Sequence, residues 1–257
     1  MMDNDRERLD IFKLIWPCKQ SLKARIMVVD SYEKEVARKV IHVFALVYLA
    51  CYFFFAVLFS HQIGLLALGG LLVLGIIIES LRLQLGVHLP LIGYLYNFRR
   101  QKELEGVGAE IYFLLGVIVS LAVFETAIAV AAILMTVFGD LTAALVGKRW
   151  GRLRLRFLPG KKSIEGFAAA LAVNVIIGVL ILRVAPDSPL WWRNLVGSSL
   201  DSIAAYSFGP VLWPLVAVMS FVAALTELTI TKVNDNLAIP VISGFAGQIT
   251  LMLLRYL

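Results

Sequence analysis

The sequence has few charged residues and only two cysteines for its length. Charged side chains make up 16% of the 257 residues, whereas 60% are hydrophobic and the mean hydropathy is +0.85. An ordinary soluble domain is excluded, since such domains carry about 25% charged residues. The composition instead predicts a membrane protein built as one bundle of helices. Cys18 lies in an amphipathic segment and Cys51 in an apolar one, so we expect free thiols and no disulfide.

No cleaved signal peptide is expected. The first apolar run begins near Val40, and the charged segment before it lacks a small-residue cleavage site. Within that segment, residues 9–29 mix apolar and basic side chains around Trp16 and Pro17, which predicts an amphipathic helix at the membrane interface. We therefore divide the chain into a cytoplasmic amphipathic segment, 1–39, and a transmembrane domain, 40–257.

Seven apolar runs approach the ~20 residues that a helix needs to cross a bilayer. They cover residues 40–59, 63–80, 106–124, 126–146, 164–184, 210–229 and 237–254. The predicted fold class is thus all-α, a polytopic membrane bundle of about seven helices with an interfacial amphipathic helix before it. Only Glu125 separates the third run from the fourth, so these two must form a tight hairpin. Residues 186–209, with Trp191 and Trp192, read as an outer loop.

The basic residues are strongly biased to one side of this arrangement. All but three of the 24 lysines and arginines fall on the side of the amino terminus, the exceptions being Arg183, Arg193 and Arg255. The positive-inside rule then gives a cytoplasmic amino terminus and an exoplasmic carboxy terminus. We attribute the net charge of +6 to this bias and to anionic lipid, and expect no nucleic-acid partner.

The unusual polar residues fall on the same cytoplasmic side. Asp140 lies inside the fourth run, beside Gly139, and a carboxylate within a span is costly and therefore indicates function. Glu79 and Arg82 end the second run, one helical turn apart. The further polar candidates at this side are Arg38, Lys39, His42, Lys161, Lys162, Ser163, Glu227, Asp235 and Asn236.

These residue types suit phosphoryl transfer from a magnesium nucleotide. Magnesium takes one or two carboxylates together with substrate phosphates, which Asp140 and Asp235 could supply, with Glu227 or Asn236 assisting. Phosphates favour cations and the free N–H groups of a helix start, which we expect at Lys161 and Lys162 with Ser163 as the N-cap. Glycines that would let the backbone approach a ligand are Gly139, Gly147, Gly151, Gly160 and Gly166.

Each feature also has a purely structural alternative. Asp140 could be a packed carboxylate paired with a lysine, and the basic run 148–162 could face lipid headgroups. Glu79 with Arg82 could be a simple pair within one helix, and His42 a packing residue. His61 and His88 receive no assignment. The segment 160–163 is no P-loop, because Leu155 stands where the first glycine is needed.

Five motifs together resemble the CTP-dependent lipid kinases, a family that includes dolichol kinase, phytol kinase and CTP-dependent diacylglycerol kinase. They are EVARKVIH at 35–42, ESLR at 79–82, GDLTAALVGKRWG at 139–151, KKSIEG at 161–166 and DNLAIP at 235–240. The resemblance implies transfer of the terminal phosphoryl group of CTP to a lipid alcohol at a divalent metal such as Mg²⁺. It adds Lys148 and Glu165 to the residues expected to contact the nucleotide, beside Gly139, Gly147 and Gly166.

Within this reading an isoprenoid alcohol such as dolichol or a polyprenol is favoured over diacylglycerol. We expect no dedicated strong base. Asp140, Asp235 or Glu79 would accept the proton of the lipid hydroxyl late in the reaction, and His42 is the next candidate. Arg38, Lys39 and Arg82 would stabilise phosphate charge. Two other functions stay open, a cytidylyltransferase that makes a CDP-lipid and a membrane transporter. The oligomeric state is not predicted.

Overall fold

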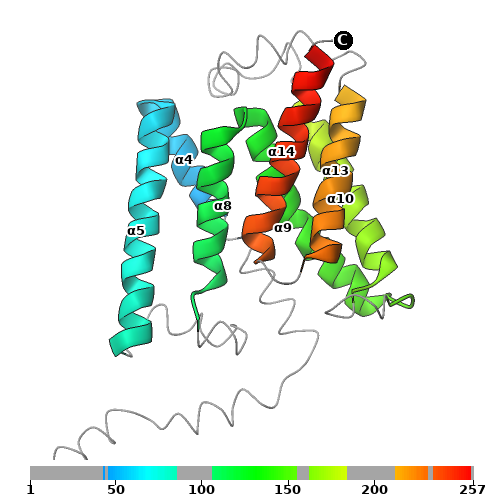
Figure 1. Cartoon of the computed structure of the whole chain (residues 1–257), viewed down its shortest axis with the longest axis horizontal. Coiled ribbons are helices and arrows are strands. Elements are labelled where there is room, and N and C mark those ends of the chain that lie inside the picture. Colours follow the sequence, from blue (N-terminus) through cyan, green and yellow to red (C-terminus); the bar gives the residue numbers. More distant parts are fainter. Residues whose placement is uncertain are drawn as a thin grey trace, which may run out of the picture.

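The computed structural model describes Val43 and residues 46–85, 106–154, 162–183, 212–230 and 234–255 (Figure 1). Several predictions fall outside these residues: the amphipathic helix at 9–29, the loop at 186–209, and the candidates Arg38, Lys39, His42 and Lys161.

Within the described residues all regular secondary structure is helical, apart from one isolated bridge. The helices are α4 (Leu46–Leu58), α5 (His61–Leu85), α8 (Ala109–Val123), α9 (Thr126–Arg149), α10 (Ile164–Leu182), α13 (Leu212–Thr229) and α14 (Asp235–Arg255). Each lies in one of the seven predicted spans, within a few residues at its ends. Five are long and apolar enough to cross a membrane, and α4 and α8 are shorter apolar helices. The polytopic helical bundle is therefore confirmed.

The tight hairpin expected near Glu125 is present. Helix α8 ends at Val123 and α9 begins at Thr126, so only Phe124 and Glu125 connect them. The backbone N–H of Glu125 donates to Gln248 Oε1 of α14 at 3.0 Å, which provides an acceptor for one N–H at the start of α9.

The helices run alternately between two ends of the bundle. Figure 1 places the end of α5, the start of α8, the junction of α9 with α10 and the start of α14 toward its lower side. This alternation brings together the helix ends that carry the candidate residues. That this lower end faces the cytosol stays a prediction.

Helix α9 forms the centre of the bundle, packing against α8, α10, α13 and α14. From Ala127 to Val137 its residues are buried, apart from the half-buried Leu134. The outer helices instead expose large apolar side chains, such as Leu66 and Leu180 at 72% and 70%. A soluble protein would bury such surface, whereas a membrane-embedded bundle presents it to lipid tails.

Candidate active site

The starts of α10 and α14 meet through opposite charges. Lys162 Nζ lies 3.6 Å from Asp235 Oδ2, with the two side chains 23% and 34% exposed. The ammonium nitrogen itself is buried and makes no hydrogen bond within the described part of the chain. A lysine has three N–H donors, so this ammonium is suited to receive phosphate oxygens. Two predicted site residues from distant motifs are thus brought together.

Ser163 caps α10 as the sequence predicted. Its backbone is extended, with φ −113° and ψ 153°, and its Oγ accepts a hydrogen bond from the Gly166 N–H at 3.1 Å. Glu165 in the first turn accepts from the backbone N–H groups of Arg152 and Leu153 at 2.9 and 3.0 Å. The Glu165 carboxylate therefore holds the segment that follows α9 beside the start of α10.

Glycines of the motifs at 139–151 and 161–166 line the contact between α9 and α10. A Cβ built on Gly147 would stand 2.9 Å from Ser163 Oγ, and one on Gly166 would stand 2.8 Å from the Ala143 carbonyl oxygen. One on Gly139 would stand 2.6 Å from Asn174 Oδ1. Small residues at four-residue spacing let membrane helices approach closely. The glycines thus allow two helices to approach; contact with a nucleotide stays a prediction.

Asp140 ends the buried stretch of α9. It is 9% exposed, whereas every residue from Leu141 to Gly147 is half-buried and Lys148 is exposed. The carboxylate thus lies where the packed core gives way to the more open lower part of the helix, two turns above its end. Asp140 thus lies within the fourth apolar run, as the sequence predicted.

The remaining acids lie at the ends of α13 and α14. Glu227 is half-buried in the last turn of α13, and Asp235 and Asn236 open α14. Among the described residues, no three His, Cys, Asp or Glu side chains gather into a group that could hold a metal. Asp140, Asp235 and Glu227 therefore do not form such a group there. The donor set still fits magnesium, which needs only one or two carboxylates beside substrate phosphates.

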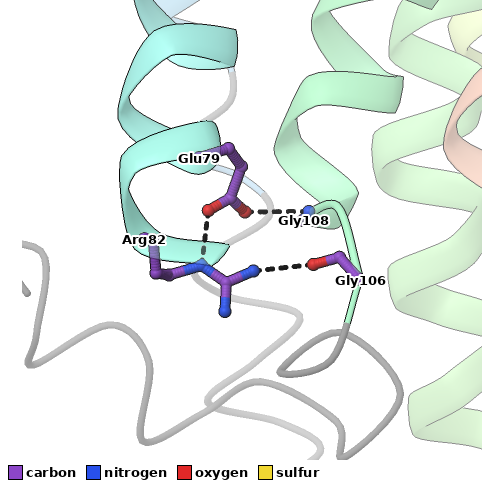
Figure 2. A network of polar contacts seen from close by, with 4 residues as sticks. All are labelled: Glu79, Arg82, Gly106 and Gly108. Atoms are coloured by element: carbon purple, nitrogen blue, oxygen red, sulfur yellow. Dashed lines mark hydrogen bonds and ion pairs between the residues drawn. The ribbon is translucent and has the colours of Figure 1, made fainter. Parts of the chain in front are cut away.

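Glu79 and Arg82 form a buried clamp on the start of α8 (Figure 2). Arg82 Nε donates to Glu79 Oε2 at 2.6 Å, and each side chain is 6% exposed. Glu79 Oε1 accepts from the Gly108 N–H at 2.9 Å, and Arg82 Nη2 donates to the Gly106 carbonyl at 2.6 Å. The pair is therefore more than an intrahelical salt bridge, since both partners also hold the backbone before another helix.

Two contacts were missed from the sequence. Asn174 is 1% exposed in the middle of α10, and its Oδ1 has no hydrogen-bond partner among the described residues. Its position opposite Gly139 follows from the antiparallel register of two helices, which no single motif reveals. His61, to which the sequence analysis assigned nothing, has a partner, since its Nδ1 lies 2.6 Å from the Tyr52 hydroxyl.

Comparison with known proteins gives three matches. The family described as the Cytidylyltransferase family matches residues 12–211. The chain is 31% identical over 161 residues to the CTP-dependent diacylglycerol kinase 1 of Schizosaccharomyces pombe, covering 60% of this chain and 68% of that protein. It is 30% identical over 147 residues to the probable phytol kinase 1, chloroplastic, of Glycine max, covering 55% and 43% respectively. No solved structure shows a significant match.

Proposed function

We propose that this chain, which belongs to the cytidylyltransferase family, is a CTP-dependent kinase that phosphorylates a membrane lipid alcohol. The resemblance to CTP-dependent lipid kinases is confirmed by relatives named as kinases of diacylglycerol and phytol. In the reaction, the alcohol oxygen forms a bond to the terminal phosphorus of CTP. The bond from that phosphorus to the bridging oxygen breaks, CDP leaves, and the hydroxyl releases its proton.

The contact between Lys162 and Asp235 is the observation that carries this proposal. A site for a nucleoside triphosphate and its metal needs a cation that binds the phosphates, close to a carboxylate that binds the metal. The start of α10 supplies the cation and the start of α14 the carboxylate, at 3.6 Å. The N-terminus of α10 adds the positive end of a helix dipole.

The carboxylates and the cations of the candidate site have different tasks. Asp140 and Asp235 would hold Mg²⁺, which when bound neutralises charge on the phosphates. Lys161 and Lys162 bind the phosphates of CTP. The proton leaves late, because loose phosphoryl transfer depends more on positioning and charge than on a strong base. Arg38, Lys39 and Lys148 add positive charge near the nucleotide.

The acceptor is proposed to be an isoprenoid alcohol, with diacylglycerol as the next choice. Its hydroxyl would lie at the cytosolic interface, where CTP is available, and its chain between helices in the inner leaflet. The test is a panel of phytol, a polyprenol, dolichol and diacylglycerol offered to the purified protein with CTP and Mg²⁺. A clear preference for diacylglycerol would overturn the isoprenoid assignment and leave the kinase proposal standing.

A second candidate is a cytidylyltransferase that makes a CDP-lipid, which the name of the family favours. The two reactions differ in the nucleotide product. The kinase releases CDP, whereas the cytidylyltransferase releases pyrophosphate. Release of pyrophosphate in proportion to a CDP-lipid would replace the first proposal with the second.

A further inference from the structure

We infer that Glu79 and Arg82 are positioning residues that set the place of Asp235 through α8 and α14, and that they do not contact the nucleotide. This inference rests on the proposed function and deepens it. Both residues belong to a motif for which a catalytic or phosphate-binding part was expected. Their hydrogen bonds to the backbone at Gly106 and Gly108 lead from α5 to the start of α8. A further hydrogen bond joins α8 to Asn236, whose neighbour Asp235 pairs with Lys162.

The first step of the series fixes the start of α8. Gly108 is the N-cap residue of that helix, with φ −65° and ψ 151°, and having no side chain it makes no cap hydrogen bond. Glu79 brings a carboxylate from α5 to the Gly108 N–H instead. A negative charge at a helix start is favourable. Arg82 completes the clamp by donating a hydrogen bond to the Gly106 carbonyl (Figure 2).

The second step joins α8 to α14. Asn236 Nδ2 donates to the carbonyl of Ala109, the first residue of α8, at 3.2 Å. Gly116 lets α14 approach α8 closely, since a Cβ there would stand 2.9 Å from the Asn236 carbonyl oxygen. The start of α14 is therefore placed by the start of α8.

The third step reaches the candidate site. Asp235 immediately precedes Asn236, and its carboxylate lies 3.6 Å from Lys162 at the start of α10. A shift of the start of α8 would thus move Asn236 and, with it, the carboxylate proposed to hold the metal. Displacements of about 1 Å at a remote position can cost roughly 10²-fold in rate.

Arg82→Lys separates this positioning role from direct phosphate binding. Lysine keeps the positive charge beside Glu79, so no lone charge is left buried, and lysine is itself a good phosphate ligand. It lacks the second nitrogen with which Arg82 reaches Gly106, so the clamp opens. Arg149→Lys is the matched control, because Arg149 is exposed at the end of α9 and has no part in the series.

Spin labels attached to cysteines introduced at Val107 and Ile242, both exposed positions, would report the distance between the start of α8 and α14 by pulsed electron paramagnetic resonance. Cys18 and Cys51 are first replaced by alanine. In the full-length protein we expect Arg82→Lys to shift or broaden this distance distribution, and Arg149→Lys to leave it as it was. The same Arg82→Lys protein without labels should lose at least about tenfold in kcat, with KM for CTP changed less than about twofold.

Two results would overturn the inference: an unchanged distance distribution, or a changed distribution with normal kcat. An unchanged distribution together with a raised KM for CTP would make Arg82 a direct phosphate ligand. If the wild-type protein transferred no phosphate from CTP, the proposed function would fail. The distance measurement would still decide whether the clamp sets α8 against α14.

Discussion

Asn174 lies against Gly139 across the contact between α10 and α9, so close that a Cβ on Gly139 would stand 2.6 Å from Asn174 Oδ1. Gly139 directly precedes Asp140, the only acid buried in α9 among its described residues. The packing of Gly139 therefore fixes the position of the Asp140 carboxylate, which is proposed to bind the metal. Substitutions at Gly139 and Asn174 can test this packing.

Gly139→Ala should destabilise the protein by about 1–3 kcal/mol, the usual cost of overpacking, because the new methyl group meets the Asn174 amide. Asn174→Ala alone should be well tolerated in stability, since it removes a buried oxygen that has no partner among the described residues. The double variant Gly139→Ala/Asn174→Ala should recover most of the loss. Thermal unfolding in detergent measures all three. Equal destabilisation of the single glycine variant and the double variant would show that Asn174 is not the obstacle.

Asp140→Asn keeps the size of the side chain and removes its charge. If Asp140 holds the metal, turnover should fall by orders of magnitude while the unfolding temperature stays near that of the wild type. His42→Gln should lose far less, because no dedicated base is expected. Near-normal turnover of Asp140→Asn would reduce this carboxylate to a packing role. A His42→Gln protein as inactive as Asp140→Asn would make His42 the base.

Lys162→Ala should weaken CTP affinity more than lipid affinity, because its buried ammonium is proposed to bind phosphate. Lys161→Ala should act in the same direction. Steady-state kinetics with CTP and the alcohol varied in turn would show the difference as a raised KM for CTP. Unchanged kinetics in both variants would mean that the basic segment only sets the orientation of the helices in the membrane and does not bind CTP.

Much of the fold was accessible from the sequence, because in a membrane protein the length of apolar runs dictates where helices lie. The hairpin at Glu125 and the Ser163 cap were likewise predicted, since both depend on neighbouring residues. The clamp was not, because Glu79 meets Gly108, and Arg82 meets Gly106, only through tertiary packing of α5 on α8. Likewise, the glycine spacing suggested close approach of the backbone, and only the register of α9 and α10 shows which helix fills the space.

The orientation of the bundle is a prediction that labelling can test. Lys232 lies outside the described residues, in the connection between α13 and α14 that the charge bias assigns to the cytosol. A cysteine introduced at Lys232 should react with an impermeant maleimide only from the cytosolic side of the membrane. Labelling only from the outside would show that the orientation is the reverse of the predicted one, and Asp235 would then lie on the side away from cytosolic CTP.

In the proposed reaction the terminal phosphoryl group of CTP moves to a lipid hydroxyl. The most direct measurement incubates the purified protein with Mg²⁺ and a lipid alcohol, using CTP labelled in parallel reactions on its γ- or α-phosphorus. We expect the label to enter the lipid from γ-labelled CTP only, and Asp140→Asn to abolish this transfer. Entry of the α-label into the lipid would contradict the account and identify a cytidylyltransferase.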